Sequence, residues 1–210
     1  MPISPGFRDR LALYTCAERV RTEPADTWVY GYDNSRKHTP PDVVVYATSA
    51  REVQDIVRLC HDTGVPLVAR GRGTATTGAA IPVRGGVVLT LERMNRILRV
   101  DPANRLMIVE PGVTNQAVQE AAAAHGFFWP PDPTSAAYCS VGGNLAVNAA
   151  GPRAVKYGVT RDHVLALRAV DGSGRELRTG GRTSKYATGY DLTRLLVGSE
   201  GTLALITEAT

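Results

Sequence analysis

The stretch VARGRGTATTGAAIP, residues 68–82, decides the fold of this chain. The apolar run at residues 66–69 predicts a buried strand, which opens into a loop of small residues. Such residues allow positive φ angles and let a ligand approach the main-chain N–H groups closely. The loop carries the glycines Gly71, Gly73 and Gly78, the threonines Thr74, Thr76 and Thr77, and the arginines Arg70 and Arg72. It predicts a phosphate or pyrophosphate site, with a mobile surface loop as the alternative.

The same residues exclude two well-known phosphate-binding loops. No Gly-Lys-Ser or Gly-Lys-Thr follows the glycines, so the loop is not a Walker A motif. Ala75 and Thr76 occupy the places where the third glycine of a Rossmann fingerprint would fall. Any phosphate bound here is therefore held by a different loop geometry.

The composition is that of an ordinary globular protein. Of the 210 residues, 43% are hydrophobic and 21% are charged, which allows a substantial core. A net charge of +4 is too small to predict nucleic-acid binding. The basic stretch at residues 151–185 is interpreted as a solvated face, with attraction of an anionic ligand or an acidic partner as the alternative.

The sequence predicts a cytoplasmic protein, either free or peripheral at a membrane. No apolar run approaches the roughly 18 residues of a membrane span, so we expect no transmembrane anchor. The N-terminal residues do not contain the apolar segment of a secretory signal. Cys16, Cys60 and Cys139 lie far apart without a C-x-x-C pair, a pattern typical of reduced thiols.

Periodicity divides the chain into a lead-in and two lobes. Residues 1–38 predict an N-terminal helix at residues 8–20 and a turn-rich segment. Residues 39–91 predict an α/β lobe, and residues 92–210 predict a lobe with an antiparallel sheet. The expected fold class is therefore α+β.

The first lobe is expected to place the glycine-rich loop at the end of a parallel strand. A β-branched strand at residues 43–46 precedes a helix that Ser49 and Glu52 begin as a capping box and Gly64 ends. The strand at residues 66–69 completes a βαβ unit. In such units ligands bind beyond the carboxyl ends of the strands, where this loop begins.

The second lobe is expected to contain two hairpins, a helix and a final strand. The hairpins pair residues 97–100 with 106–110 and residues 164–170 with 176–179. A helix begins after Thr114 and runs through an alanine-rich stretch. The last strand follows a tight turn.

Four segments in this order resemble the FAD-binding domain of the vanillyl-alcohol-oxidase or PCMH type. The likeness is strongest to the glycolate oxidase D-subunit and D-lactate dehydrogenase branch of FAD-linked oxidases. The segments are RGRGTATTG at residues 70–78, PPDPTS at 130–135, VGGNLAVNAAGPRAVKYGVTRD at 141–162 and GYDLTRLLVGSEGTLALITE at 189–208. The resemblance covers the chain from about residue 40 onward, and it implies the PCMH-type fold.

The resemblance also implies which residues bind FAD. The first loop would bind the pyrophosphate, and its residues are Ala69, Arg70, Gly71, Arg72, Gly73, Thr74, Ala75 and Gly78. Two segments would lie along the isoalloxazine and ribityl groups, namely Asp132, Pro133, Thr134, Ser135 and Tyr138, and Gly142, Gly143, Asn144, Val147, Asn148 and Ala149. The ribityl and adenosine parts would lie along Glu200, Gly201, Thr202, Leu205 and Ile206.

The chain departs from the family pattern in three respects. Ala75 and Ala204 stand where close relatives usually have glycine, and no histidine or cysteine lies in the loop or beside Asn148, so we expect non-covalent FAD. In the family a second, cap domain holds the substrate, and it supplies a histidine pair that binds metal and substrate-binding arginines. That domain would follow Thr210, so the sequence predicts no metal site and no catalytic residue of its own.

The resemblance favours the FAD-binding part of an enzyme that oxidises a small anionic D-2-hydroxy acid, glycolate or D-lactate, by hydride transfer to FAD. A different hypothesis is a non-catalytic or partner-dependent flavin module that requires another subunit or the missing C-terminal domain. A reductase with the same flavin fold and a phosphate-binding protein without flavin are further alternatives. A large exposed apolar patch would favour the partner-dependent module.

Overall fold

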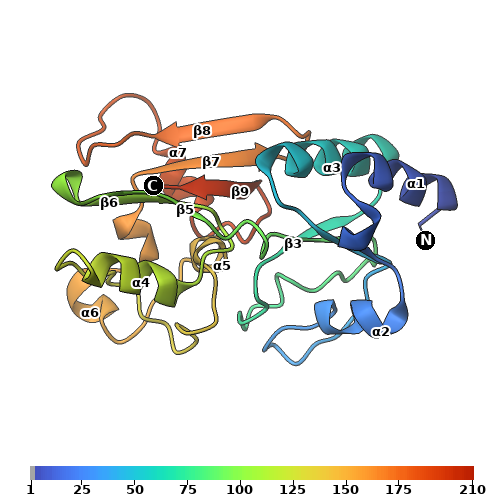
Figure 1. Cartoon of the computed structure of the whole chain (residues 1–210), viewed down its shortest axis with the longest axis horizontal. Helices are drawn as coiled ribbons and strands as arrows, with labels where there is room; N and C mark the ends of the chain where they lie inside the picture. Colours follow the sequence, from blue (N-terminus) through green and yellow to red (C-terminus); the bar gives the residue numbers. More distant parts are fainter. Residues whose placement is uncertain (1–2) are drawn as a thin grey trace.

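A computed structural model describes residues 3–210, and it shows two halves that lie side by side (Figure 1). The helices are α1 (Pro5–Tyr14), α2 (Pro24–Thr27), α3 (Ala50–Thr63), α4 (Asn115–Ala123), α5 (Val141–Ala146), α6 (Ala154–Tyr157) and α7 (Leu192–Leu196), and the 3-10 helices are η1 (Ala17–Arg19), η2 (Trp28–Tyr30), η3 (Pro102–Asn104) and η4 (Thr160–His163). The strands are β1 (Val20–Arg21), β2 (Val43–Tyr46), β3 (Leu67–Arg70), β4 (Val87–Thr90), β5 (Ile97–Asp101), β6 (Leu106–Val109), β7 (Ala166–Asp171), β8 (Glu176–Gly180) and β9 (Ala204–Ala209). The mixed composition and the two sheets confirm the α+β class.

The first sheet has the strand order β1-β2-β4-β3, and β2, β3 and β4 are parallel. Leu89 of β4 is paired on one side with Val45 and on the other with Ala69, so β4 separates the two strands of the predicted βαβ unit. Val43, Val44 and Val45 are completely buried, as a β-branched run without alternation indicates. Both faces of this strand are therefore covered by protein.

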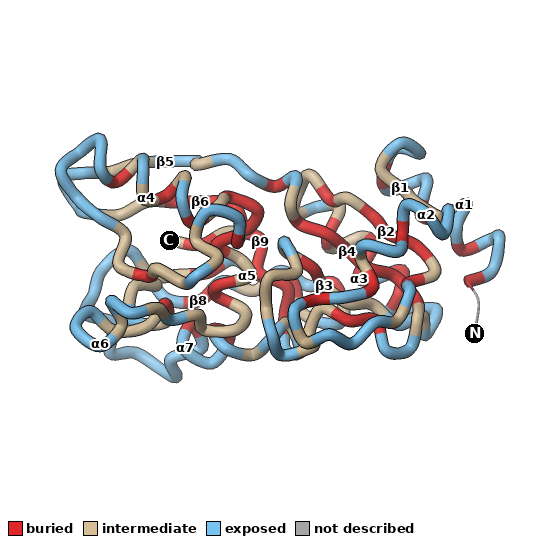
Figure 2. Tube along the Cα trace, turned by 90° about the horizontal axis from the view of Figure 1, so that it is seen from below, coloured by how far each residue is buried: buried red, intermediate tan, exposed pale blue. Residues whose placement is uncertain are grey.

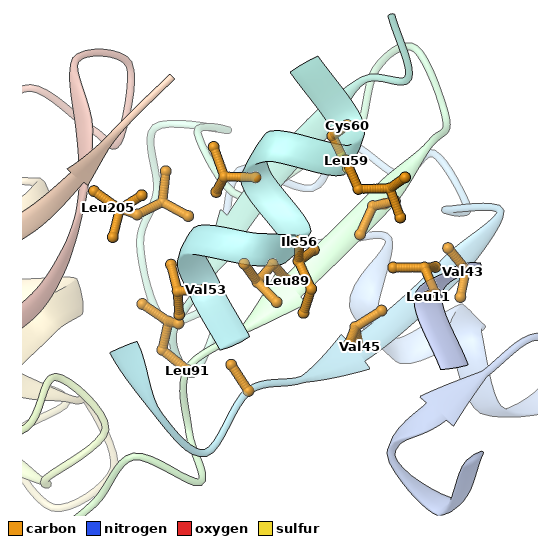
Figure 3. Close-up of a cluster of buried hydrophobic side chains, with 14 of the residues drawn as sticks. Leu11, Val43, Val45, Val53, Ile56, Leu59, Cys60, Leu89, Leu91 and Leu205 are labelled. Atoms are coloured by element: carbon orange, nitrogen blue, oxygen red, sulfur yellow. The ribbon is translucent and has the colours of Figure 1, made fainter. Parts of the chain in front are cut away.

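Helix α3 covers the first sheet with its apolar side. Val53, Ile56 and Leu59 lie over Leu89 and Val45 of the sheet (Figure 3). The helix begins at Ser49, whose Oγ accepts the N–H of Glu52 at 3.3 Å, and ends at Gly64 in the left-handed conformation. Only half of the predicted capping box forms, because the Glu52 carboxylate accepts the N–H of Thr48 and the guanidinium of Arg19 instead.

The N-terminal helix differs from the expected residues 8–20. It runs over Pro5–Tyr14, and it begins at Ser4, whose Oγ accepts the N–H of Phe7. Ser followed by proline is a strong helix start that hydrophobic spacing alone did not reveal. Val20 lies in the short strand β1 and pairs with Val45, so the end of the expected helix belongs to the first sheet.

The second sheet is antiparallel and has the order β5-β6-β9-β7-β8. Both predicted hairpins form, β5 with β6 and β7 with β8, and the last strand β9 lies between them. Buried segments run through the middle of both halves, whereas α6 and the outer loops are exposed (Figure 2). Among residues 3–210, no helix has both the length and the apolar character needed to cross a membrane.

Candidate functional site

The glycine-rich loop that follows β3 presents a row of main-chain N–H groups. Within the described part of the chain, the N–H groups of residues 71–77 donate to no protein acceptor. Gly73 and Gly78 have φ angles of 68° and 84°, which glycine adopts without strain. Most backbone donors in a folded protein are paired, and consecutive free donors in a loop form a site for an anion.

Helix α5 approaches this loop more closely than residues with side chains would allow. Ser140 begins the helix, and its Oγ accepts the N–H of Gly143 at 3.3 Å. A Cβ atom on Gly71 would lie 2.6 Å from that oxygen, and one on Gly142 would lie 2.5 Å from the Cβ of Pro111. Glycine is therefore required on both sides of the contact.

The turn before β9 closes the other side of the site. Gly198 donates its N–H to Leu145 O at 2.9 Å, and Glu200 donates to Ala146 O at 2.8 Å, so the turn binds the last carbonyls of α5. Glu200 has a φ angle of 56°, which is unusual for a residue with a side chain. Gly201 faces Ala69, because a Cβ atom on Gly201 would lie 3.8 Å from the Ala69 Cβ.

Together these segments enclose a narrow cavity of about 60 Å³ between the two sheets. Nine of the predicted cofactor residues line it: Ala69, Arg70, Gly71, Gly142, Gly143, Glu200, Gly201, Leu205 and Ile206. The sequence interpretation missed seven others: Leu91, Pro111, Ser140, Ala146, Leu196, Ser199 and Ala204. Ser140 could have been found as the residue that begins a helix, and Ala146 and Ala204 as small residues within the same motifs.

Other predicted residues lie outside this cavity. Arg72, Gly73, Thr74, Ala75 and Gly78 belong to the outer part of the loop, and Thr202 follows Gly201 in the turn. Pro133, Thr134, Ser135 and Tyr138 lie in the connection between α4 and α5, where Tyr138 is 74% exposed. Val147 and Ala149 directly follow α5.

Three predicted polar side chains contact protein groups. Asn144 donates to Asn115 Oδ1 at 3.0 Å, and Trp129 Nε1 donates to the same oxygen, so the Asn144 amide joins α5 to the start of α4. Asn148 accepts the N–H of Arg161 at 2.9 Å. Asp132 accepts the N–H of Arg153 at 3.1 Å. These side chains hold neighbouring segments of the second half together.

The Arg70 guanidinium also binds protein groups. It is only 7% exposed, and it donates to Tyr32 O at 2.7 Å and to Val29 O at 3.2 Å. Burial lowers the pKa of this guanidinium, because the charged form loses hydration. The sequence interpretation treated Arg70 as a source of positive charge for the ligand, whereas the structure directs its side chain into the first half.

Many of the basic side chains at residues 151–185 form ion pairs. Arg153 is paired with Asp132 at 3.4 Å, Arg175 with Asp171 at 2.9 Å and Arg178 with Glu176 at 3.1 Å. These arginines are about half exposed or more, so solvent and counter-charges reduce their field.

A larger cavity of about 540 Å³ lies in the second half, and mainly apolar side chains line it, including Val118, Phe127, Trp129 and Leu145. None of the predicted cofactor residues lines this cavity. Within residues 3–210, no group of three or more His, Cys, Asp or Glu side chains could hold a metal ion. The narrow cavity beside the loop is therefore the better candidate for a nucleotide cofactor, because free N–H groups and closely approaching glycines adjoin it.

Comparison with known families agrees with this geometry. The sequence matches the FAD binding domain family over residues 41–180, a range that begins before β2 and ends with β8. The chain belongs to the FAD binding domain family. FAD is thus the cofactor of this domain, and the resemblance inferred from the four sequence segments is confirmed.

Curated relatives of this FAD binding domain are flavin-linked oxidoreductases. It is 40% identical over 208 residues to the glycolate oxidase subunit GlcD of Bacillus subtilis, covering 99% of this chain and 44% of that protein. It is 46% identical over 168 residues to a D-lactate dehydrogenase of Archaeoglobus fulgidus, covering 80% of this chain and 38% of the relative. A D-2-hydroxyglutarate dehydrogenase of Xanthomonas citri is 40% identical over 195 residues, with coverages of 92% and 41%.

The domain also has a solved structural neighbour. An alkyldihydroxyacetonephosphate synthase matches it with a TM-score of 0.86 and 26% sequence identity, covering 99% of this chain and 43% of that structure. This match confirms the PCMH-type fold. The FAD binding domain spans less than half the length of each of these four relatives.

Proposed function

We propose that the chain is the FAD-binding part of a flavin-dependent oxidoreductase that oxidises a D-2-hydroxy acid of the glycolate or D-lactate type. Two relatives whose names carry these activities support the substrate class. Bound FAD supplies the acceptor for the hydride that leaves the substrate α-carbon. The contribution of this chain is to bind and orient the cofactor.

The observation that carries the proposal is the row of free N–H groups at residues 71–77, beside a cavity that only glycines allow to form. We propose that these groups, with the Thr74 hydroxyl, bind the FAD pyrophosphate, because charge-assisted hydrogen bonds to N–H groups suit this anion. The α5 segment with the connection before it would lie along the isoalloxazine and ribityl groups. The segment from Glu200 to Ile206 would lie along the ribityl and adenosine parts.

We further propose that FAD is bound without a covalent link. No histidine or cysteine lies in the loop at residues 71–78, and Cys139, next to the first residue of α5, is buried. Acid precipitation of the holoprotein should then release all of the flavin into the supernatant. Flavin absorbance that stays with the precipitate would contradict this.

An absorption spectrum tests the proposal most directly. The purified chain, incubated with FAD and freed of excess, should show a flavin spectrum that dithionite bleaches. Glycolate and D-lactate are then added separately under anaerobic conditions, with L-lactate as the stereochemical control. Bleaching by a D-2-hydroxy acid supports the full proposal, and absence of bound flavin contradicts it.

The second candidate is a flavin module that needs a partner polypeptide to complete the substrate site. Exposed apolar side chains around α7 favour it, because Tyr190, Leu195 and Leu203 are 91%, 57% and 48% exposed. The limited coverage of the relatives agrees with it. Flavin that is bleached by dithionite but by neither hydroxy acid would support this candidate over an enzyme that is active as this chain.

A further inference from the structure

The segment that contains η2 and the residues after it lies against the glycine-rich loop, although the sequence interpretation placed it in the lead-in. Asn34 donates its N–H to Ala75 O at 2.9 Å and its amide to Thr74 O at 3.1 Å. Asp33 accepts the N–H of Gly78 at 2.9 Å. These three bonds join residues 33–34 to the far end of the loop, and they leave the N–H groups of residues 71–77 free.

The near end of the loop is fixed by Arg70. Its guanidinium donates to Tyr32 O and Val29 O and lies 5.5 Å from the ring centroid of Tyr30. Gly73 folds back over this guanidinium, and any Cβ atom at that position would overlap it. The Arg70 side chain therefore fills the space beneath the loop and connects it to the preceding segment.

Asp33 has a similarly constrained position at the other end. Its side chain is in a residue that is only 3% exposed, and its two oxygens accept the N–H groups of Gly78 and Ser35. A buried carboxylate without these donors would be strongly unfavourable, so the bonds hold the loop in one position. Arg70 and Asp33 thus fix the two ends of the same loop.

We propose that Arg70 and Asp33 are positioning residues for the FAD site, which hold the loop at residues 71–78 in the conformation that directs its N–H groups to the cofactor. The proposal rests on the assignment of this loop to FAD. It extends the cofactor site to residues 29–34, whose side chains and carbonyls do not touch the cavity. Neither residue transfers a proton or contacts the reacting atoms.

The physical reason is preorganisation. A loop built mainly from glycine, alanine and threonine has many accessible conformations, and ordering it on binding would reduce the affinity for FAD. Bonds that order the loop before FAD arrives remove this penalty. Loss of either positioning residue should therefore weaken FAD binding in proportion to the disorder that it creates.

Arg70→Met is the principal test variant, with Arg72→Met as its matched control. Arg72 is exposed and makes no hydrogen bond within the described residues. We expect the Kd for FAD, measured by flavin fluorescence quenching, to rise at least tenfold in Arg70→Met and less than threefold in Arg72→Met. Arg70→Lys, which can restore one of the two carbonyl bonds, should give an intermediate Kd.

Trypsin provides a readout that does not depend on FAD. Arg72 is a cleavage site inside the loop, and its cleavage rate in the apoprotein reports how often the loop opens. We expect cleavage after Arg72 to accelerate at least fivefold in Arg70→Met and in Asp33→Ala, with Asp33→Asn closer to wild type. Far-UV circular dichroism identifies variants that do not fold, and for these the conservative variants Arg70→Lys and Asp33→Asn decide.

The outcomes separate this inference from the proposed function. Wild-type cleavage and wild-type affinity in Arg70→Met and Asp33→Ala overturn the inference. Faster cleavage in the variants of a wild-type chain that binds no FAD confirms that the loop is braced and contradicts the assigned cofactor site. Equal loss of affinity in Arg70→Met and Arg72→Met would show that charge, not loop position, governs FAD binding, and it also overturns the inference.

Discussion

Gly71 and Ser140 belong to different halves of the molecule, and they meet so closely that a Cβ atom on Gly71 would lie 2.6 Å from Ser140 Oγ. The serine oxygen cannot move away freely, because it accepts the N–H of Gly143 at the start of α5. Every atom added at position 71 therefore competes with the hydrogen bond that begins this helix. The contact joins the glycine-rich loop to α5.

Gly71→Ala should disturb this contact. We expect a loss of about 1–3 kcal/mol in the free energy of unfolding, which is the usual range for overpacking, and at least a tenfold rise in the Kd for FAD. Urea denaturation and flavin titration measure the two effects. Gly172→Ala is the control, because nothing lies within 4 Å of a Cβ atom at that position, which has no positive φ angle. Equal stability of the two variants would contradict the prediction.

Glu200→Gly should stabilise the apoprotein. Glu200 has a φ angle of 56°, and replacing its side chain removes left-handed strain, which exceeds the added entropy cost of glycine by roughly 0.5–1 kcal/mol. The free energy of unfolding of the apoprotein measures the gain. Glu23→Gly is the control at an exposed site with a φ angle of −69°, and it should lower stability. A loss in Glu200→Gly would mean that the Glu200 side chain makes a favourable contact.

Glu52→Gln should lower stability in a pH-dependent way. Burial alone raises the pKa of the Glu52 carboxyl, but the hydrogen bonds from Arg19 and from the N–H of Thr48 lower it further, so the net shift is downward. A folded-state pKa below the unfolded value of about 4.3 gives a stabilisation that is complete above that pH and is lost as the pH falls through the folded-state pKa. At pH 7 we expect Glu52→Gln to cost about 1–3 kcal/mol, since Arg19 loses its charged partner.

Urea denaturation between pH 3 and pH 7 measures this effect. The difference between wild type and Glu52→Gln should be largest near neutral pH and should shrink below pH 4. Glu18→Gln, at an exposed neighbouring site, should change stability by less than about 0.5 kcal/mol at every pH. Parallel pH profiles for wild type and Glu52→Gln would contradict the linkage.

The three cysteines should differ sharply in reactivity. Burial raises the pKa of the Cys60 thiol to about 12, and Cys139 is 2% exposed, whereas Cys16 is exposed. Ellman's reagent at pH 8 should therefore react rapidly with one thiol in the folded protein and with all three in denaturant. Cys16→Ser should abolish the rapid phase. A second rapid thiol would indicate that the packing around Cys60 or Cys139 opens readily.

Much of the fold could be predicted from local patterns. The valines of β2, the spacing of Val53, Ile56 and Cys60 in α3, and the two hairpins of the second sheet each reflect a short stretch of sequence. The position of β4 between β2 and β3 could not be predicted in this way, because strand order depends on pairing between distant segments. The two-residue strand β1 is too short to leave a pattern.

The candidate site was predicted unevenly for a similar reason. Glycines such as Gly71 and Gly142 reveal themselves because the sequence spends no side chain where two backbones meet. The direction of a long side chain carries no such signal, so Arg70 was assigned to the ligand although it binds Val29 O and Tyr32 O. The role of the Asn144 amide, which binds Asn115, depends on a residue in another helix and was missed.

The narrow cavity takes its walls from both sheets, since Ala69 ends one side and Ile206 of β9 forms another. A ligand that occupies it acts as a bolt through the seam between the two halves. Because such a ligand binds only while the halves are together, each tenfold gain in its concentration above Kd adds about 1.4 kcal/mol against their separation. Cofactor supply and mechanical unity of the domain are thus the same variable, and heating the apoprotein should pull the halves apart before either one melts.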